Sequence, residues 1–228
     1  MKVAHFDFSK PFELDDNVGV LVCENPQKFV QYCSDFLSQQ HGEDGNFIII
    51  DDKDRISFKK SGCVIFDYFN LSLSDKKIVS GLYSQLQELV EDDFQQEYID
   101  LRSRIIAFFD ELSVESPMAI DFNADFDFSD ILKGLRVLPK QEDQSFSDKL
   151  ADYLDACAKF LGTKFYVLVN VRTFLCDDDF SALLTHIGYA QYSVLFLERT
   201  QFKRVKNERI IVIDNDLCEI LVDDENVC

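Results

Sequence analysis

The segment Phe-Tyr-Val-Leu-Val-Asn at residues 165–170, together with Ser-Val-Leu-Phe-Leu-Glu at residues 193–198, gives the clearest indication of the fold. Both runs are apolar along nearly their whole length, as in strands that are covered on both faces of a sheet. Between them, three consecutive aspartates at positions 177–179 mark the start of a helix, because carboxylates favour a helix N-terminus. Strand, helix and strand in this order predict a βαβ unit.

The same alternation extends over both ends of the chain. Apolar runs at residues 18–23, 47–50, 63–66 and 210–213 predict further strands, and residues 56–58 predict a short one. Amphipathic segments that begin at Pro26 and at Ser145 predict helices, the second of which ends at Gly162. We therefore predict an α/β fold with a mostly parallel sheet that carries helices on both faces.

The middle of the chain has a different character. Apolar residues recur at helical spacing from residue 74 to about residue 112, which predicts two long helices with a break near Asp92 and Asp93. A short helix is predicted at residues 129–135. We predict an α-helical leg at residues 67–149, inserted into an α/β head made of residues 1–66 and 150–228.

Composition sets outer limits. The chain has 228 residues, of which 46% are hydrophobic, so it can bury a sizeable core and is too apolar for a disordered acidic tail. No stretch of about 18 consecutive apolar residues is present, which argues against a membrane span. Because the first residues alternate like a strand and carry acids, no signal peptide is expected, and we predict a cytoplasmic protein that begins at Met1.

Cysteines and histidines do not form a transition-metal pattern. The seven cysteines include no C-x-x-C pair, and most have apolar neighbours, as reduced and buried cysteines do. The three histidines have no H-x-x-x-H spacing. Zinc and disulfide-exchange sites are therefore not predicted.

No catalytic motif is complete. None of the eight glycines is followed by lysine, so the chain lacks the loop that cradles phosphates in nucleotide hydrolases. The run at residues 47–51 resembles the apolar strand and terminal aspartate of a Walker B motif, although a strand followed by aspartate is common in any parallel sheet. No G-x-S-x-G sequence for a nucleophilic serine occurs either. We therefore predict neither nucleotide hydrolysis nor nucleophilic catalysis.

An acidic segment precedes the short helix predicted at residues 129–135. It places oxygen-bearing side chains at alternate positions, as calcium loops do, at Asp121, Asn123, Asp125 and Asp127. The segment is not an EF-hand, because Phe126 and Leu132 stand where that loop needs glycine and glutamate. Its alternative interpretation is an acidic approach to a helix whose phenylalanines pack within the helical leg.

The net charge of −19 argues against DNA, because affinity for duplex comes mostly from lysine and arginine. Local basic clusters nevertheless exist. The first contains Lys133, Arg136 and Lys140 at a helix end and the loop beyond it, and is followed by Lys149. A second lies between residues 199 and 209. Either cluster could equally be ordinary solvated surface.

Several segments in fixed order resemble one known family. They are the runs at 165–170 and 193–198, a strand followed by Asn-Pro at residues 20–26, the segment Asp-Ile-Leu-Lys-Gly-Leu-Arg-Val at 130–137, and Ile-Val-Ile-Asp at 211–214. In this order they resemble the Csn2 family, the type II-A CRISPR-associated spacer-acquisition proteins. The resemblance covers the whole chain loosely and depends on order and spacing more than on any one motif.

The resemblance implies a head similar to an inactive P-loop ATPase core, a helical leg, and a ring-shaped homotetramer. Such a ring is not an enzyme: it binds ends of double-stranded DNA without sequence specificity, requires bound Ca2+, and works with the integrase subunits and the guide-RNA nuclease of the same system. The DNA-binding positions carried over are Lys133, Arg136, Lys140 and Lys149. The carried-over metal ligands are Glu115, Asp121, Asn123, Asp125 and Asp127, in a segment where residues 116–119 depart from the family pattern as an insertion.

Two other functions remain open at this point. One is a metal-dependent nuclease or nucleotide hydrolase on the same α/β core, which would need Asp51. The other is an acidic protein-interaction module without affinity for DNA, for which Lys133 and Arg136 would be dispensable.

Overall fold

The chain divides into two compact units, which are described separately. A computed structural model describes residues 1–14, 18–140, 144–205 and 209–222. The α/β unit comprises Met1–Ser72 and Glu142–Cys228, and the helical unit comprises Leu73–Gln141. Residues 67–72 and 142–149, which the sequence analysis assigns to the helical leg, thus belong to the α/β unit.

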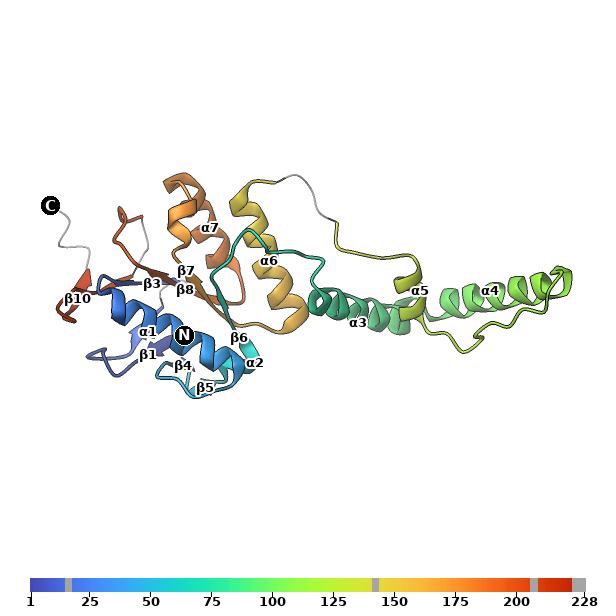
Figure 1. Cartoon of the computed structure of the whole chain (residues 1–228), viewed down its shortest axis with the longest axis horizontal. Coiled ribbons are helices and arrows are strands. Elements are labelled where there is room, and N and C mark those ends of the chain that lie inside the picture. The colour runs from blue at the N-terminus through green and yellow to red at the C-terminus, as the bar shows by residue number, and fades with distance from the viewer. Residues whose placement is uncertain (15–17, 141–143, 206–208, 223–228) are drawn as a thin grey trace. The chain divides into compact units, whose positions relative to one another are not determined.

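A six-stranded, mostly parallel sheet forms the centre of the α/β unit (Figure 1). Its order is β10 (Glu219–Val222), β9 (Ile210–Ile213), β3 (Val18–Cys23), β8 (Ser193–Glu198), β7 (Phe165–Val169) and β6 (Gly62–Ile65). All neighbouring strands are parallel except β10, which runs antiparallel to β9. The predicted βαβ unit is confirmed: β7 and β8 pair in parallel and are joined by α7 (Asp177–Tyr189).

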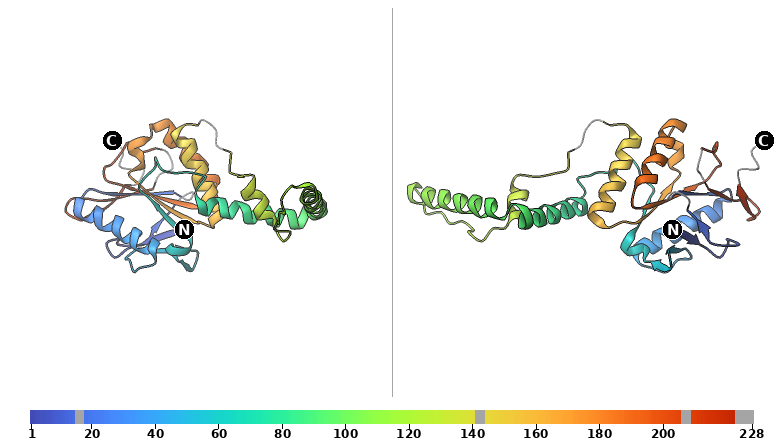
Figure 2. Two further views of the ribbon diagram at one scale, coloured as in Figure 1. Left: turned by 45° about the vertical axis from the view of Figure 1, so that its right-hand side comes forward. Right: turned by 180° about the vertical axis from the view of Figure 1, so that it is seen from behind.

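Helices cover both faces of this sheet (Figure 2). Helix α1 (Pro26–His41) lies on one face, and α6 (Phe146–Leu161) and α7 lie on the other. Every residue of β3, β7, β8 and β9 is buried, which explains why these strands read as continuous apolar runs. On the second face, the rings of Phe180 in α7 and Phe196 in β8 lie 5.0 Å apart.

A small antiparallel sheet packs with α1. Its order is β2 (Phe12–Glu13), β1 (Lys2–Ala4), β4 (Ile48–Asp51) and β5 (Asp54–Ile56). The strand predicted at residues 47–50 exists, but it belongs to this sheet and not to the parallel one. The stretch predicted as a strand at 56–58 is confirmed only at Ile56, which ends β5; Ser57 is the N-cap of α2 (Phe58–Ser61), and the ring centroid of Phe58 lies 5.5 Å from that of Phe36. Burial of that ring takes precedence over the local β pattern.

The helical unit contains α3 (Lys76–Asp93), α4 (Gln95–Glu115) and α5 (Phe128–Gly134). The two predicted long helices are confirmed, with the break at Phe94. In Figure 1, α4 continues the direction of α3, and the segment after α4 runs back along it to α5, which packs on α3. The hydroxyl of Tyr83 in α3 donates to the carbonyl oxygens of Leu132 in α5 and of Val137 in the loop after it, at 3.3 and 3.1 Å. These contacts hold α5 on α3.

Phenylalanines fasten the returning segment to α4. The rings of Phe122 and Phe109 lie 5.4 Å apart, and the guanidinium of Arg102 lies over Phe126. The phenylalanines of this segment therefore pack within the helical unit. Across the part of the chain that the structure describes, no helix has the length and hydropathy needed to cross a membrane.

Candidate nucleic-acid interface

Three predicted DNA-binding residues follow one another along the end of α5 and the loop after it. The helix starts with a capping box, in which Asp127 accepts from the backbone N–H of Asp130 and Asp130 accepts from that of Asp127. Lys133 occupies the last turn and is 62% exposed. Arg136 and Lys140 follow in the exposed loop. The cluster is thus a helix end plus a loop, as predicted.

The backbone at this helix end is held in an unusual conformation. Arg136 has a φ of +52°, in the left-handed region that costs a non-glycine residue roughly 1–3 kcal/mol. The backbone N–H groups of Arg136 and Val137 donate to the carbonyls of Lys133 and Leu132. This turn directs the chain away from α5 and fixes where Arg136 emerges.

Two neighbouring side chains already accept hydrogen bonds from Lys133. Its ammonium donates to the hydroxyl of Ser129 at 3.0 Å and to Asp130 Oδ1 at 3.2 Å. The ion pair is exposed, so it stabilises the helix by only about 0–1 kcal/mol and can exchange for a phosphate. Lys149 is exposed on the first turns of α6, in the α/β unit, so the fourth predicted contact comes from the other unit.

The residues predicted as calcium ligands follow one another between the end of α4 and the start of α5. Glu115 ends α4, and Asp121, Asn123 and Asp125 follow along the returning segment. The described residues contain no group of three or more histidines, cysteines, aspartates or glutamates that could hold a metal ion. The individual calcium ligands therefore stay a prediction.

Several of these side chains already accept hydrogen bonds from backbone N–H groups. Asn123 Oδ1 accepts from the N–H of Asp125 at 2.9 Å, and Asp121 Oδ1 accepts from the N–H of Phe122 at 3.0 Å. Asp127 caps α5 and accepts from the hydroxyl of Ser129, and these hydrogen bonds lower the pKa of its carboxyl. The alternating oxygens thus shape the approach to α5.

At the connection between β3 and α1, the helix N-terminus is capped by the chain itself. Nucleotide-binding folds use this first βα turn as an anion cradle. Here the side-chain oxygen of Asn25 accepts from the N–H groups of Gln27 and Lys28, both at 3.1 Å, and Pro26 supplies no N–H. The free donors of the helix N-terminus are therefore satisfied by the chain itself.

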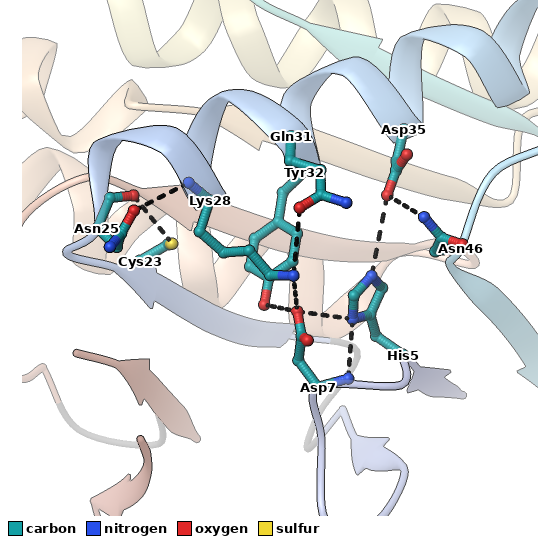
Figure 3. Close-up of polar contacts among 9 residues, drawn as sticks. All are labelled: His5, Asp7, Cys23, Asn25, Lys28, Gln31, Tyr32, Asp35 and Asn46. Atoms are coloured by element: carbon teal, nitrogen blue, oxygen red, sulfur yellow. Dashed lines mark hydrogen bonds and ion pairs between the residues drawn. The ribbon is translucent and has the colours of Figure 1, made fainter. Parts of the chain in front are cut away.

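Lys28, in the first turn of α1, belongs to a polar cluster next to this helix (Figure 3). Lys28 Nζ lies 2.5 Å from Asp7 Oδ2, which also accepts from the hydroxyl of Tyr32 at 2.7 Å. The imidazole of His5 is buried, and its Nδ1 accepts from the N–H of Asp7 at 3.1 Å, so the neutral ring carries its proton on Nε2, facing Asp35. Lys28 is thus held by a carboxylate of its own chain.

Asp51 lies away from the carboxyl ends of the parallel strands. It ends β4 in the antiparallel sheet, pairs with Asp54 across a turn, and is exposed. The resemblance of residues 47–51 to a Walker B strand is therefore not confirmed: β4 lies in the antiparallel sheet, and only Ile49 of this strand is fully buried.

At the carboxyl ends of β7 and β8 the structure shows two buried charged residues, Arg172 and Glu198, that the sequence analysis did not identify. The backbone N–H of Arg172 donates to Glu198 Oε1 at 3.2 Å, and its guanidinium stacks 4.0 Å from the Phe180 ring and donates to the carbonyl of Lys203. Both side chains are almost completely buried. The signal available in the sequence is a charged residue directly after, or at the end of, an apolar strand.

Comparison with known families gives one match. A family model described as CRISPR-associated protein (Cas_Csn2) matches residues 39–217, or 179 of the 228 residues. The matched stretch spans the end of α1, the whole helical unit, and the strands as far as β9. No curated protein matches the chain.

Proposed function

Because the chain belongs to the Cas_Csn2 family of CRISPR-associated proteins, whose role is in CRISPR adaptation, we propose that it acts as a homotetrameric ring. The ring binds ends of double-stranded DNA without sequence specificity and depends on calcium. It assists the capture of new spacers in the cytoplasm and carries out no reaction of its own.

The exposed apolar face of α4 is the main observation in support of a multi-subunit assembly. None of the 21 residues of α4 is fully buried. Leu101, Ile105, Phe108 and Leu112 recur at intervals of four, three and four, the spacing of a seam between paired helices, and Phe108 is 57% exposed. We name these four residues the α4 seam. A helix of this length with such a seam favours burial against another helix, and a second copy of the chain supplies one.

Local charge supports contact with DNA despite the acidic whole. Lys133, Arg136 and Lys140 are exposed on one helix end, where backbone phosphates could replace Asp130 as the partner of Lys133. Contacts of this kind neutralise phosphates and carry no sequence information. Repetition of the cluster in four subunits would multiply the positive charge around one duplex.

The capped β3–α1 connection supports a role without nucleotide hydrolysis. Asn25 accepts the hydrogen bonds that a phosphate would otherwise receive at this helix N-terminus, and Lys28 is paired with Asp7. The same α/β architecture thus serves as a scaffold.

Calcium dependence belongs to the proposal through family membership alone. The described residues hold no group of three or more histidines, cysteines, aspartates or glutamates that could hold a metal ion, so a bound ion would draw on a second subunit or on amide and carbonyl oxygens. The proposed partners in the same system are the integrase subunits and the guide-RNA nuclease.

A gel shift tests the proposal. The protein is titrated against a linear duplex and against the same duplex sealed into a circle, each with calcium chloride or with EGTA. A threaded ring shifts the linear form in calcium, does not shift the circle, and loses the linear complex in EGTA.

Two outcomes would contradict the proposal. Equal binding to the circle would show that the protein does not need DNA ends. The absence of any shift at low salt would show that it does not bind DNA. Cleavage of either DNA in magnesium would show a nuclease instead.

A further inference from the structure

Leu135 follows α5 directly and places an apolar side chain within the run of bases at this helix end. It is 73% exposed, whereas Leu132, three residues earlier, is 5% exposed. Residues three apart lie on the same face of a helix, so a leucine at position 135 would ordinarily be covered like Leu132. Instead it stands at the surface between Lys133 and Arg136, which are exposed as well.

The backbone around Leu135 is held in place by hydrogen bonds. Its own N–H donates to the carbonyl of Ile131 at 2.9 Å. The hydroxyl of Tyr83 in α3 donates to the carbonyls of Leu132 and Val137, which lie on either side of Leu135 in the sequence. The leucine is therefore displayed on an ordered turn, which reduces the entropy lost when a ligand covers it.

Positive charge around this turn is local. The described residues that matter are 127–140 and, on α3, residues 76–90, which are the two turns, about 10 Å, on either side of Tyr83. Charges farther along α3 lie beyond one Debye length, about 10 Å at 0.1 M salt. Within these ranges the structure has five bases against three acids: Lys76, Lys77, Lys133, Arg136 and Lys140 against Glu88, Asp127 and Asp130.

This excess is too small to attract DNA as a broad positive field. Glu142 and Asp143 also follow in the sequence, although they lie outside the described residues. The two nearest acids, Asp127 and Asp130, form the capping box at the other end of α5. Phosphate binding here therefore depends on individual contacts made by Lys133 and Arg136, and the position of the leucine relative to these contacts becomes decisive.

A duplex that meets Lys133 and Arg136 also meets the leucine between them. Basic side chains contact phosphates, which line the edges of a groove. A side chain between two such contacts faces the groove, where an apolar group meets the bases. The minor groove, about 6 Å wide, admits single side chains, and leucine is among the apolar residues that insert there between base steps and partly unstack them.

We propose that Leu135 is an apolar wedge that enters the minor groove of double-stranded DNA and partly unstacks one base step. Lys133 and Arg136 hold phosphates on either side of it. The wedge rests on the proposed function, since it concerns the same DNA and the same helix end. It reads no base edge, but it favours flexible pyrimidine–purine steps such as TA slightly, because these unstack most easily.

The test uses the full chain in calcium chloride with a linear duplex that carries 2-aminopurine, a fluorescent analogue of adenine, in its TA steps. Stacking quenches this fluorescence, so unstacking by a wedge raises it. Affinity and its salt dependence are measured by anisotropy on a duplex of the same sequence with a terminal dye. Circular dichroism verifies that each variant is folded.

The variant is Leu135→Ser, and Leu135→Met keeps an apolar side chain of similar volume. The matched control is Met118→Ser. It removes a 76% exposed apolar side chain from the segment between α4 and α5, where no base is adjacent in the sequence.

We expect the wild type, Leu135→Met and Met118→Ser to raise the 2-aminopurine fluorescence, and Leu135→Ser not to raise it. Leu135→Ser should weaken binding about tenfold, as expected for the loss of one buried leucine side chain. The slope of log affinity against log salt should stay unchanged, because the substitution removes no positive charge. A purely electrostatic contact would show neither the fluorescence change nor the loss of affinity.

Three results would overturn the wedge. They are binding by the wild type without a rise in fluorescence, an affinity of Leu135→Ser no lower than that of Met118→Ser, or a lower mass of Leu135→Ser in light scattering without DNA, which would make Leu135 a contact between copies. In each of these cases the wild type still binds the duplex, so the wedge fails and the proposed function stands. A wild type that binds no duplex at low salt would contradict both.

Discussion

The α/β unit and the helical unit satisfy their apolar residues in different ways. Strands β3, β7, β8 and β9 are buried along their whole length, with helices on both faces. In the helical unit, Ile78 and Leu132 are the fully buried apolar residues among those described, and α4 has none. The first unit has a core of its own, whereas the second leaves an apolar face exposed. We therefore expect stability and the proposed assembly to depend on separate parts of the sequence.

The largest expected effect comes from removing a core ring. Phe196→Ala leaves a cavity between β8 and α7 and should lower the free energy of unfolding by about 3–5 kcal/mol. Phe108→Ala removes the same ring from the exposed α4 seam and should change the stability of the isolated chain by less than about 0.5 kcal/mol. Urea denaturation at low protein concentration measures both. Equal losses of stability in the two variants would contradict the difference in burial between the two units.

Assembly should respond in the opposite way. Leu101→Glu with Phe108→Glu places two carboxylates in the α4 seam and should reduce the mass in solution toward the 26.4 kDa of one chain. The matched control is Ser103→Glu with Ala107→Glu, which adds the same charge at exposed positions outside the seam. Light scattering after size exclusion gives the masses. An unchanged mass in the seam variant would show that the α4 seam does not form a contact between subunits.

A smaller effect is expected for the basic cluster of the helical unit. Lys133→Ala with Arg136→Ala should reduce the slope of log affinity against log salt by roughly 1 for each phosphate that is no longer neutralised. Lys53→Ala, an exposed lysine of the α/β unit in the turn between β4 and β5, is the control and should leave the slope unchanged. Fluorescence anisotropy with a labelled linear duplex measures the slopes. A small and equal decrease of the slope in all variants would mean that binding depends on net charge alone.

The smallest effect concerns pH and lies wholly in the α/β unit. Burial lowers the pKa of His5 below its ordinary value of 6.5, although Asp7 and Asp35 oppose that shift and Lys28 assists it. The unfolded chain then binds one more proton than the folded chain between pH 6.5 and the lowered pKa. Stability should therefore fall with decreasing pH in this window, by at most about 1.4 kcal/mol per pH unit. Urea denaturation between about pH 5 and 7 should show a flatter profile for His5→Gln, and an unchanged profile would exclude this imidazole as the source.

Local pattern was sufficient for much of the fold. Continuous apolar strands separated by helix starts predicted the parallel sheet, and β7, α7 and β8 are arranged as predicted. The predicted caps of α6 are also confirmed, since Ser145 and Gly162 bound this helix. These features depend on neighbours in sequence, so the sequence displays them directly.

Features that depend on distant contacts could not be predicted in this way. Strand β4 resembles a parallel strand, yet it pairs with β1 and β5, because pairing partners are chosen by the tertiary fold. The alternating oxygens before α5 resemble a calcium loop, but the phenylalanines between them pack on α4 and the amide and carboxyl oxygens bond nearby N–H groups. The hydrogen bond from the backbone N–H of Arg172 to Glu198 joins residues 26 positions apart, and the sequence shows of it only a charged residue at or near the end of each strand.

Sedimentation velocity of the wild-type protein with a labelled linear duplex in calcium tests the ring directly, because it reports mass and DNA occupancy together. A DNA-binding homotetramer should give a protein mass near four times 26.4 kDa, with the duplex sedimenting in the same boundary. A single-chain mass with the duplex sedimenting separately would show that the chain forms no such ring.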